Sequence, residues 1–552
     1  MHHWWSCPYP ALLESLFLLL PLAYAEIHYT LKGFSLVFRK RPEILADAPW
    51  RIEPGQTLPL LILIKDADKF PVRLASVSVE LQYEDGTAEN TCLLEKPVDI
   101  RDPWWMHIGA IRPRRGYHGR ILMDVRFEAV YINTGKKDRF LNDNLWSSSH
   151  RPLTCTAASD PLPSLDHWIH GDLHFHSAYT NDQVEYGAPL QAAARMAQAM
   201  GLGFMAATDH SYDLDDCEDS FLKNDPDLPK WNAMHRETET IEQKTGLTLL
   251  PGEEVSAGNH GNENVHLLLL NNKDYYPGAG DSNEQWFKNR PDLTLREILD
   301  QMDEDTLAFA AHPGVPFAPL QWILLKRGIW NRNDYGHPRL HGLQIYNGCE
   351  DRAFSRGRRD WVKQLLNGRR LIVIAGNDAH GNFNRHRKLG QPFLYVAESE
   401  EHTFGRGRTL VHLPGGLTRK TLMAALRDGK CSVTTGPAAD IRVTNAKGES
   451  SGIGSSVSCG PFILEIRAKS TPEFGKITRC DLYVGNLEAK KESLIRRWDS
   501  FQEEYRILKT AELSIQSPAY IRVELFSGSG KSEYFCMTNP VWIESTVTHN
   551  HP

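Results

Sequence analysis

Short apolar segments alternate with amphipathic helical segments between about residues 166 and 435. Of all features of the sequence, this alternation restricts the possible folds most. The apolar segments are GLGFMAATDH, TLLPGEEVS, NVHLLLL, LAFAAHPG, GLQIYNG and LIVIAGNDAH. Helical spacing is found in APLQAAARMAQAMG, WNAMHRETETIEQKTG, TLREILDQMDED and FSRGRRDWVKQLLNG. Strands that alternate with helices predict a parallel sheet or barrel. A length of about 270 residues fits a closed or nearly closed β/α barrel.

The regions on either side of this α/β region read as strands. Residues 26–165 contain TLPLLILIKDAD, RLASVSVELQYEDGT and GRILMDVRFEAVYINTGKK, and turn residues such as Asp85-Gly86 end two of these runs. Residues 436–552 contain FILEIRAKS, CDLYVGN, AYIRVELFSGSG and VWIES. We expect a β-sandwich-like domain in each region, the first of immunoglobulin-like size.

The first 25 residues allow two interpretations. Leu16–Leu22 is apolar and Ala23-Tyr24-Ala25 has the small-x-small form of a signal-peptide cleavage site, but no Lys or Arg precedes it and Glu14 interrupts the apolar run. Residues 1–25 are therefore either a leader segment or a segment packed on the first domain, and export stays open. No later segment reaches the ~20 apolar residues of a membrane span.

Charge and cysteine content exclude two classes of function. The net charge of −7 provides no basic excess to replace counterions on a nucleic acid, so a stable nucleic-acid partner is not expected. The nine cysteines form no C-x-x-C pair, which argues against zinc ribbons and redox motifs. We expect a small-molecule substrate, and the sequence does not indicate an oligomeric state.

Imidazoles and carboxylates recur at the ends of the apolar segments. In HGDLHFHSAYTND, the residues at two-residue spacing share one face if the segment is a strand. Each motif alone has an ordinary explanation: a polar strand edge, a helix cap, a packed histidine or a solvated loop residue. Parallel β/α barrels build their active sites from the ends of several strands, and this set is large enough for two or three metal ions. The candidate ligands are His174, His176, Asp182, His210, Glu254, His266, His312, Asp378 and His380.

These motifs resemble a known family. DLHFH, TDH, PGEE, VHLLLL, AAHP and GNDAH occur in the order found in the PHP (polymerase and histidinol phosphatase) domain. The resemblance covers about Asp166 to Pro437, and it implies a distorted seven-stranded β/α barrel with a trinuclear metal site. The flanking β regions and LPGGLTRKTLMAALRDGKCSVTTGP are similar to the multidomain branch that includes carbaryl hydrolase-like metallohydrolases.

The resemblance also implies how the ligands divide among three metal ions. Asp182 stands where many family members have His, which leaves the identity and affinity of the third ion in doubt. Glu253 is an alternative to Glu254, although the G-x-E spacing of the family favours Glu254. The first ion is expected at His174, His176, Glu254 and Asp378, the second at Glu254, His266 and His312, and the third at Asp182, His210 and His380.

A metal-dependent hydrolase is the function that these ligands favour. Ions that share a bridging water lower its pKa and supply hydroxide at neutral pH, and imidazole with carboxylate ligands suits zinc, manganese or iron. The ions outweigh the negative charge of the ligands, which favours an anionic substrate such as a phosphate ester. We expect His174, His176, Glu254, Asp378 and His380 to be catalytic.

Three residues are candidates for binding the substrate, and two other functions stay open. Arg385 and Arg387 follow the last ligand and are able to clamp a phosphate, although a solvated basic loop is as good an explanation. Asn347 ends a strand at the expected active face. The alternatives are a carboxylic ester or carbamate hydrolase, and a non-catalytic binding protein that the metal stabilises.

Overall fold

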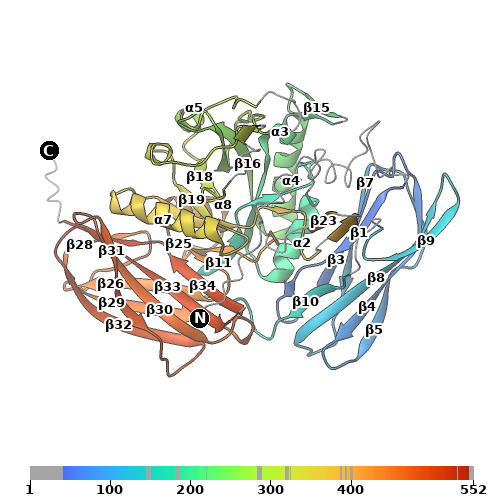
Figure 1. Cartoon of the computed structure of the whole chain (residues 1–552). Helices are drawn as coiled ribbons and strands as arrows, with labels where there is room; N and C mark the ends of the chain where they lie inside the picture. The colour runs from blue at the N-terminus through green and yellow to red at the C-terminus, as the bar shows by residue number, and fades with distance from the viewer. Residues whose placement is uncertain are drawn as a thin grey trace.

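The protein has two β-rich regions with an α/β region between them, as the computed structural model shows (Figure 1). Residues 1–25, either a leader or a segment packed on the first domain, lie outside the described residues. No helix within the described residues is long and apolar enough to cross a membrane. The structure describes residues 41–144, 151–181, 187–218, 220–282, 289–316, 322–323, 325–385, 388–391, 394–397, 402–530 and 532–545.

The N-terminal region consists of two sheets that pack face to face around a shared apolar core. The small sheet has the order β1-β3-β7, and β3 is buried along its whole length because its other face packs against helix α2 (Leu190–Met200). This double burial explains the unbroken apolar run LPLLILI. The strands are β1 (Glu43–Asp47), β2 (Arg51–Ile52), β3 (Leu58–Lys65), β4 (Val72–Tyr83), β5 (Ala88–Leu94), β6 (Val98–Ile100), β7 (Trp104–Ile111), β8 (Gly119–Tyr131), β9 (Lys136–Leu141) and β10 (Leu153–Ala157).

The central region contains a sheet whose strands follow one another in chain order from β11 to β20. Six ladders join its neighbouring strands: four are parallel, and the two that involve β17 are antiparallel. The strands in this order are β11, β13, β16, β17, β18, β19 and β20. The main strands are β11 (Trp168–Asp172), β13 (Phe204–His210), β16 (Thr248–Gly258), β17 (Asn264–Leu270), β18 (Leu307–Ala311), β19 (Gly342–Asn347), β20 (Ile372–Gly376), β24 (Arg408–His412) and β25 (Cys431–Thr434).

Helices and short strands complete the central region. The four predicted helices are present, and Thr294 with Glu297 forms the predicted capping box at the start of α5. The helices are α2, α3 (Ser211–Leu214), α4 (Pro229–Thr245), α5 (Leu295–Gln301), η2 (Asp334–Gly336), α7 (Arg352–Leu366) and α8 (Arg419–Arg427). The short strands pair as β12 (Phe175–His176) with β21 (Ala379–His380), β14 (Asp216–Cys217) with β15 (Ser220–Asn224), and β22 (Lys388–Gln391) with β23 (Leu394–Ala397).

The described strands do not close into a hydrogen-bonded barrel, so the predicted (β/α)7 barrel is only partly observed. Strand β20 pairs with β19, and β11 pairs with β13 and β24. No described ladder joins β20 to β11. A side chain links β20 to β24 instead, because Thr409 Oγ1 accepts from the amide of Ala375 at 2.9 Å. The predicted parallel sheet has one exception at β17, which runs antiparallel to both of its neighbours. The connection from β16 is too short for a parallel crossover.

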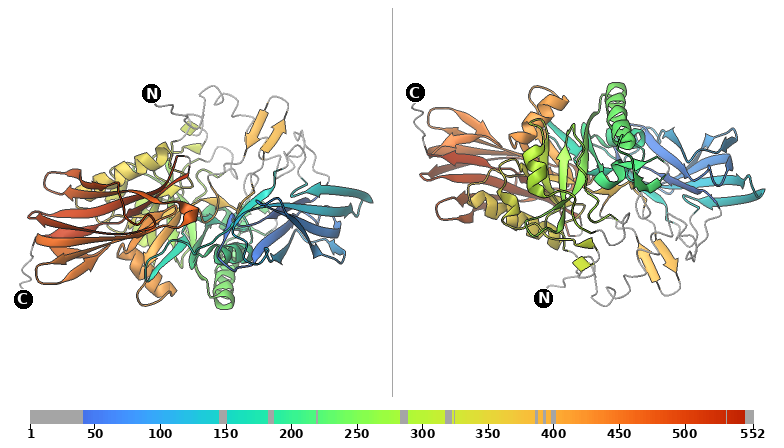
Figure 2. Two further views of the ribbon diagram at one scale, coloured as in Figure 1. Left: turned by 90° about the horizontal axis from the view of Figure 1, so that it is seen from below. Right: turned by 90° about the horizontal axis from the view of Figure 1, so that it is seen from above.

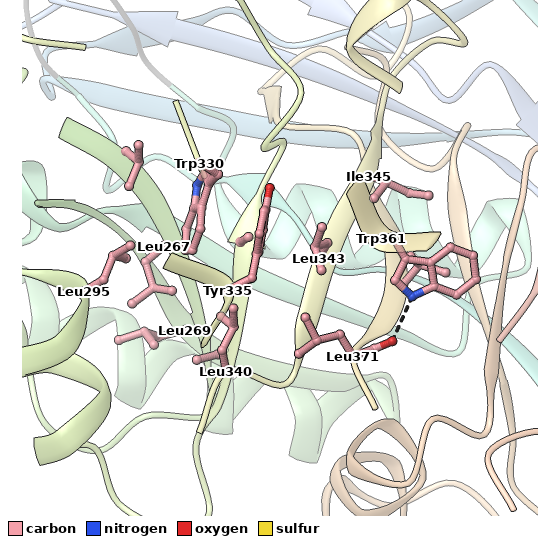
Figure 3. Packing of buried hydrophobic residues seen from close by; sticks show 14 of the residues in the cluster. Leu267, Leu269, Leu295, Trp330, Tyr335, Leu340, Leu343, Ile345, Trp361 and Leu371 are labelled. Atoms are coloured by element: carbon pink, nitrogen blue, oxygen red, sulfur yellow. Dashed lines mark hydrogen bonds between the residues drawn. The ribbon is translucent and has the colours of Figure 1, made fainter. Parts of the chain in front are cut away.

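Packed side chains cover one face of this sheet (Figure 3). Leu267 and Leu269 of β17 meet Leu295 of α5, while Leu343 of β19 lies toward Trp361 of α7. The indole Nε1 of Trp361 donates to the carbonyl of Leu371 at 2.8 Å and so ties α7 to the start of β20. This packing fixes the positions of the strands whose ends carry the predicted ligands.

The sheet of the central region continues into the C-terminal β region, because β25 pairs with β34. Strands β34, β33 and β30 then pack against a four-stranded sheet with the order β27-β26-β29-β32 and enclose an apolar core. Figure 2 shows this region at the end of the molecule opposite the N-terminal sheets. Its elements are β26 (Ala438–Asn445), β27 (Ser450–Gly452), β28 (Ser456–Ser458), β29 (Gly460–Lys469), η3 (Pro472–Phe474), β30 (Ile477–Asn486), β31 (Lys491–Trp498), β32 (Arg506–Ile515), β33 (Ala519–Ser529), β34 (Ser532–Thr538) and β35 (Val541–Glu544).

Candidate metal centre

Eight of the nine predicted ligands lie in the described part of the chain, and they form three overlapping groups of candidate metal ligands. Within each group, one nitrogen or oxygen atom of every residue lies within 4.8 Å of those of the others. The ninth residue, Asp182, lies outside the described residues. The groups are His174, His176, Glu254 and Asp378; Glu254, His266 and His312; and His176, His210 and His380. We call them the first, second and third ligand groups.

The ends of the strands bring these residues to one edge of the sheet. His210 is the last residue of β13 and lies opposite Glu254 in the parallel ladder with β16. His312 and Asp378 follow β18 and β20 closely. His266 lies near the start of β17, but β17 is antiparallel, so its beginning meets the same edge. The ligands thus converge because of strand direction as well as sequence position.

The first group has the spacing of a four-coordinate site. His174 Nε2 lies 3.1 Å from His176 Nε2 and 3.4 Å from both Glu254 Oε2 and Asp378 Oδ1. His176 Nε2 lies 3.3 Å from Glu254 Oε2 and 3.0 Å from Asp378 Oδ1. Donors at 2.0–2.2 Å from a shared ion stand roughly 3.4 Å apart at the corners of a tetrahedron. The observed distances therefore fit one ion between these four side chains.

Glu254 belongs to the first and second groups, and one of its oxygens also lies near His210 of the third group. Oε1 lies 2.8 Å from His266 Nδ1 and 3.0 Å from His312 Nε2. Oε2 faces the first group and also lies 3.3 Å from His210 Nδ1. Oε2 is buried and has no hydrogen bond of ordinary geometry within the described residues. A carboxylate with nitrogen atoms of imidazoles around both oxygens has the donor arrangement of a bridging ligand.

The third group forms around His176. The rings of His176 and His380 are stacked with centroids 4.0 Å apart, and β12 and β21 pair these two residues directly. His210 lies beside them, and Tyr212 stacks on its ring at 4.6 Å. The three imidazoles offer nitrogen atoms to one point without a carboxylate from the described residues.

The backbone at two ligands is strained. His312 and Asp378 have φ values of 30° and 52°, in the left-handed region that costs a non-glycine residue about 1–3 kcal/mol. A hydrogen bond holds the backbone of Asp378 in place, because its amide donates to the carbonyl of His174 at 3.0 Å. A side chain at Gly376 would lie 2.3 Å from the Cβ of His174, so only glycine permits this approach.

Two polar residues of β19 orient ligands of the first group, and sequence reasoning did not identify the first of them. His174 Nδ1 donates to Gln344 Oε1 at 2.8 Å, so the other ring nitrogen, Nε2, faces the group. Gln344 Nε2 donates to Asn347 Oδ1, and Asn347 Nδ2 donates to Asp378 Oδ2 at 3.1 Å. A buried glutamine within the apolar run GLQIYN was the available signal. The substrate-binding role of Asn347 stays a prediction.

Asp281 is a second residue that the sequence did not reveal. Its Oδ2 atom lies 3.0 Å from His266 Nε2 and 2.8 Å from Arg327 Nε, and Ser256 Oγ donates to its other oxygen. The imidazole thus donates Nε2–H to Asp281 and turns Nδ1 toward Glu254. Asp281 lies in a glycine-containing loop 15 residues after His266, where no spacing rule indicates a contact.

Replacement of Asp281 by asparagine should weaken metal binding at the second group. The asparagine can no longer accept from His266 and Arg327 with a full negative charge, and loss of such partners typically lowers metal affinity by about 10–100-fold. Competition with a chromogenic chelator measures this affinity directly. Asp300→Asn, at an exposed aspartate that pairs with His337 elsewhere on the surface, is the control and should bind metal as the wild type does.

Asp172 and Asp209 accept hydrogen bonds from backbone amides near the candidate ligands. Asp172 accepts from the amides of His174 and Gly405 at 3.2 and 3.0 Å. Asp209 accepts from the amides of Ser177 and Thr180 at 2.6 and 3.0 Å. Both buried carboxylates therefore fix the turns that present the histidines, because amides in these turns have no ladder partners.

The charges of the cluster require cations. Burial raises the pKa of Glu254, but His266 and His174 outweigh it and hold the pKa well below its usual range. Burial alone would lower the pKa values of His174 and His266. The nearby carboxylates have the larger, opposite effect, so the pKa values rise to about 9 and about 10. Protons on imidazoles balance the carboxylates when no metal is bound, and divalent ions would replace these protons.

The predicted arginine clamp is only partly described. Arg385 is buried at 8% exposure, and its backbone amide donates to Asp47 Oδ1 at 3.0 Å. Burial raises the pKa of Asp47 to about 6, and the charge of Arg385 opposes that rise. The guanidinium thus lies near an acid of the N-terminal region. Arg387 lies outside the described residues, and a role of either arginine in substrate binding stays a prediction.

Comparisons with known proteins identify no family for this chain. No family model matches it, and no curated protein matches it. Among solved structures, a glycosyl hydrolase family 2 member from Bacteroides cellulosilyticus matches at 10% identity and a TM-score of 0.17, over 92% of this chain and 63% of that one. The β-glucuronidase of Parabacteroides merdae matches at 8% identity and a TM-score of 0.19, over 92% and 64%. This chain thus spans less than two thirds of both proteins, and TM-scores this low support no inference about function.

Proposed function

We propose that the protein is a metal-dependent hydrolase, with phosphate esters as the favoured substrates. The observation that carries this proposal is the position of Glu254, whose two oxygens face different sets of imidazoles. Structural metal sites are usually closed by four ligands around one ion. A carboxylate shared between sets of histidines is instead typical of clusters that hold several ions for hydrolysis.

Two or three divalent ions would be held by the three ligand groups. Zinc, manganese and iron all suit imidazole and carboxylate donors. Such ions lower the pKa of water and stabilise negative charge on a reacting phosphoryl or carbonyl oxygen. The protein itself orients the ligands through Gln344, Asn347 and Asp281, and it excludes water from the buried side of the cluster.

Exposure indicates the side from which the substrate would approach. The side chains of Asp378 and His312 are 18% and 12% exposed, whereas those of His174, His176 and Glu254 are buried. His380 is partly exposed beside Asp378. We therefore place the reacting group of the substrate near Asp378, His312 and His380.

The charge balance favours an anionic substrate. Two divalent ions would bring four positive charges against the two negative charges of Glu254 and Asp378, and the charge of Asp281 is already balanced by Arg327. A site with excess positive charge and limited water stabilises an anion more than a neutral ester. This argument places phosphate mono- or diesters ahead of carboxylic esters and carbamates.

The resemblance to PHP domains supports the same proposal. The ligand sets that the resemblance implies coincide with the three groups, apart from Asp182. The chain-order sheet from β11 to β20, with β12 and β21 joining its two ends beside His176 and His380, supports a distorted (β/α)7 barrel. We propose that the central region is a PHP-like domain of a carbaryl hydrolase-like multidomain protein.

A panel of substrates tests the proposed function. Purified protein loaded with zinc or manganese is assayed with a chromogenic phosphate monoester, phosphate diester, carboxylic ester and aryl carbamate. We expect phosphate ester turnover that His176→Ala abolishes, because His176 belongs to two ligand groups. Turnover of only the neutral substrates would favour the ester or carbamate hydrolase. No turnover with tightly bound metal would favour the non-catalytic binding protein, and unchanged metal content and turnover in His176→Ala would rule out the assigned site.

A further inference from the structure

The N-terminal β region contacts the loop that follows His380. Asp47, the last residue of β1, is completely buried and accepts hydrogen bonds from two amides of this loop. Its Oδ2 atom accepts from Phe383 N at 2.9 Å, and its Oδ1 atom accepts from Arg385 N at 3.0 Å and from its neighbour Ala48 N at 2.8 Å. Both oxygens of the carboxylate are therefore occupied by backbone donors.

Two further bonds connect the same two regions. The amide Nδ2 of Asn384 donates to the carbonyl of Thr154 in β10 at 2.5 Å. Three consecutive residues, 383–385, are thus hydrogen-bonded to the N-terminal region. Lys65 of β3 donates from Nζ to Asn181 Oδ1 at 3.1 Å, in the turn that follows His176. The N-terminal region therefore contacts the loops that follow two members of the third ligand group.

Packing transmits this contact to the ligands. Phe383 is buried, and its ring lies 6.2 Å from Phe175 and 5.6 Å from Phe404 between centroids. Phe175 precedes His176 and lies opposite Ala379 in the β12–β21 ladder. Gly381 is in the left-handed region at φ 68°, and a side chain there would meet the amide of Ala188 at 2.6 Å. His380 is therefore held between this ladder and a loop with little room to shift.

We propose that the N-terminal β region is a structural part of the metal centre, with Asp47 as the residue that positions His380. This inference rests on the proposed function, since it assumes that the third ligand group binds a metal ion. The carboxylate of Asp47 binds the amides of Phe383 and Arg385 and so fixes the loop. The fixed loop positions the ring of Phe383. This ring packs against Phe175 and so stabilises the β12–β21 pair. The β region thus acts on the site and is not only a separate binding module.

Asp47→Asn tests the proposal in the full-length protein. The asparagine keeps the size of the side chain but replaces one acceptor oxygen by an NH₂ group, which faces an amide donor and releases the loop. Zinc and manganese stoichiometry and affinity are measured by equilibrium dialysis and elemental analysis. We expect the weakest class of bound ions to lose about 10–100-fold in affinity, as on loss of a residue that orients a ligand. The other ions should stay bound, and Asp99→Asn, at an exposed residue of the same region that pairs with Arg73, should match the wild type.

A double variant tests whether Asp47 acts through His380. His380→Ala should remove the same class of ions, and Asp47→Asn combined with His380→Ala should bind metal as His380→Ala alone does. Additive losses would show that Asp47 acts by another route and would overturn the proposal. Asn384→Ala removes only the bond to Thr154 and should weaken the same ions to a smaller extent, which provides the decisive test if Asp47→Asn does not fold.

The outcomes separate this inference from the proposed function. Suppose that His380→Ala loses metal while folded Asp47→Asn and Asn384→Ala bind metal as the wild type does. This result overturns the positioning role and leaves the metal centre intact. Unchanged metal binding in His380→Ala and His176→Ala overturns the metal centre itself, and the inference with it.

Discussion

Replacing Glu254 by glutamine is expected to remove bound metal and to lower turnover by about 1,000-fold or more. Both oxygens of this carboxylate face imidazoles of the ligand groups. The glutamine side chain would have one acceptor oxygen fewer and no negative charge. Metal ions supply several kcal/mol of transition-state stabilisation, and about 4 kcal/mol corresponds to about 1,000-fold in rate. Elemental analysis of the purified variant and the substrate panel measure the two losses.

Glu253→Gln is the matched control because the two glutamates are adjacent in β16 and point to opposite faces. Glu253 is buried, and its Oε1 atom accepts from Asn272 Nδ2 at 2.6 Å and from Tyr276 N at 3.1 Å. Burial raises its pKa well above the usual range, so glutamine resembles the protonated side chain. We expect wild-type metal content and turnover in this variant. Equal losses in both variants would show that the assignment of Glu254 as the shared ligand is wrong.

Removal of metal is expected to lower the melting temperature by roughly 5–10 °C for each tightly bound ion. An ion present at 100 times its Kd stabilises the folded state by about 2.7 kcal/mol. One kcal/mol shifts the Tm of a domain of this size by about 2–4 °C. Differential scanning fluorimetry with EDTA, followed by addition of zinc or manganese, measures the loss and its recovery. A Tm that does not change with EDTA would contradict the presence of tightly bound ions.

The destabilisation by EDTA should increase with pH. In the metal-free protein, Glu254 and Asp378 outweigh the effect of burial and raise the pKa of His174 to about 9. Glu254 and Asp281 outweigh it at His266 and raise that pKa to about 10. Stability from a raised pKa is fully present below the unfolded value of about 6.5 and is lost as the pH rises through the folded value. The metal-free protein should therefore lose stability between about pH 6.5 and pH 10. The metal-bound protein should lose less, because bound ions take the place of these protons.

Local patterns in the sequence were sufficient for much of the fold. The capping box of Thr294 and Glu297 and the glycines that end α2 and α4 are decided by residues within one turn of the chain, and the structure has them as expected. The β-rich character of the two flanking regions also follows from local alternation. Closure of the central sheet depends instead on which distant strand edges meet, and the expected closed barrel was not observed within the described ladders.

The candidate ligands could be chosen from the sequence because metal-binding side chains are chemically distinctive and recur at strand ends. The residues that orient them could not, since Gln344, Asn347 and Asp281 are ordinary polar residues whose role depends on a contact across the fold. The choice between Glu253 and Glu254 also needed the structure to show which face of β16 each residue occupies.

The sequence by itself determined the kinds of candidate ligands and their order along the chain, because residue type and spacing carry that information. Only the tertiary structure decided how they meet. The antiparallel direction of β17 brings His266 to the same edge as Glu254. Asp47 lies 336 residues before Phe383 in the chain and yet binds its amide. Contacts between such distant residues depend on the packing of whole regions, which no local pattern encodes.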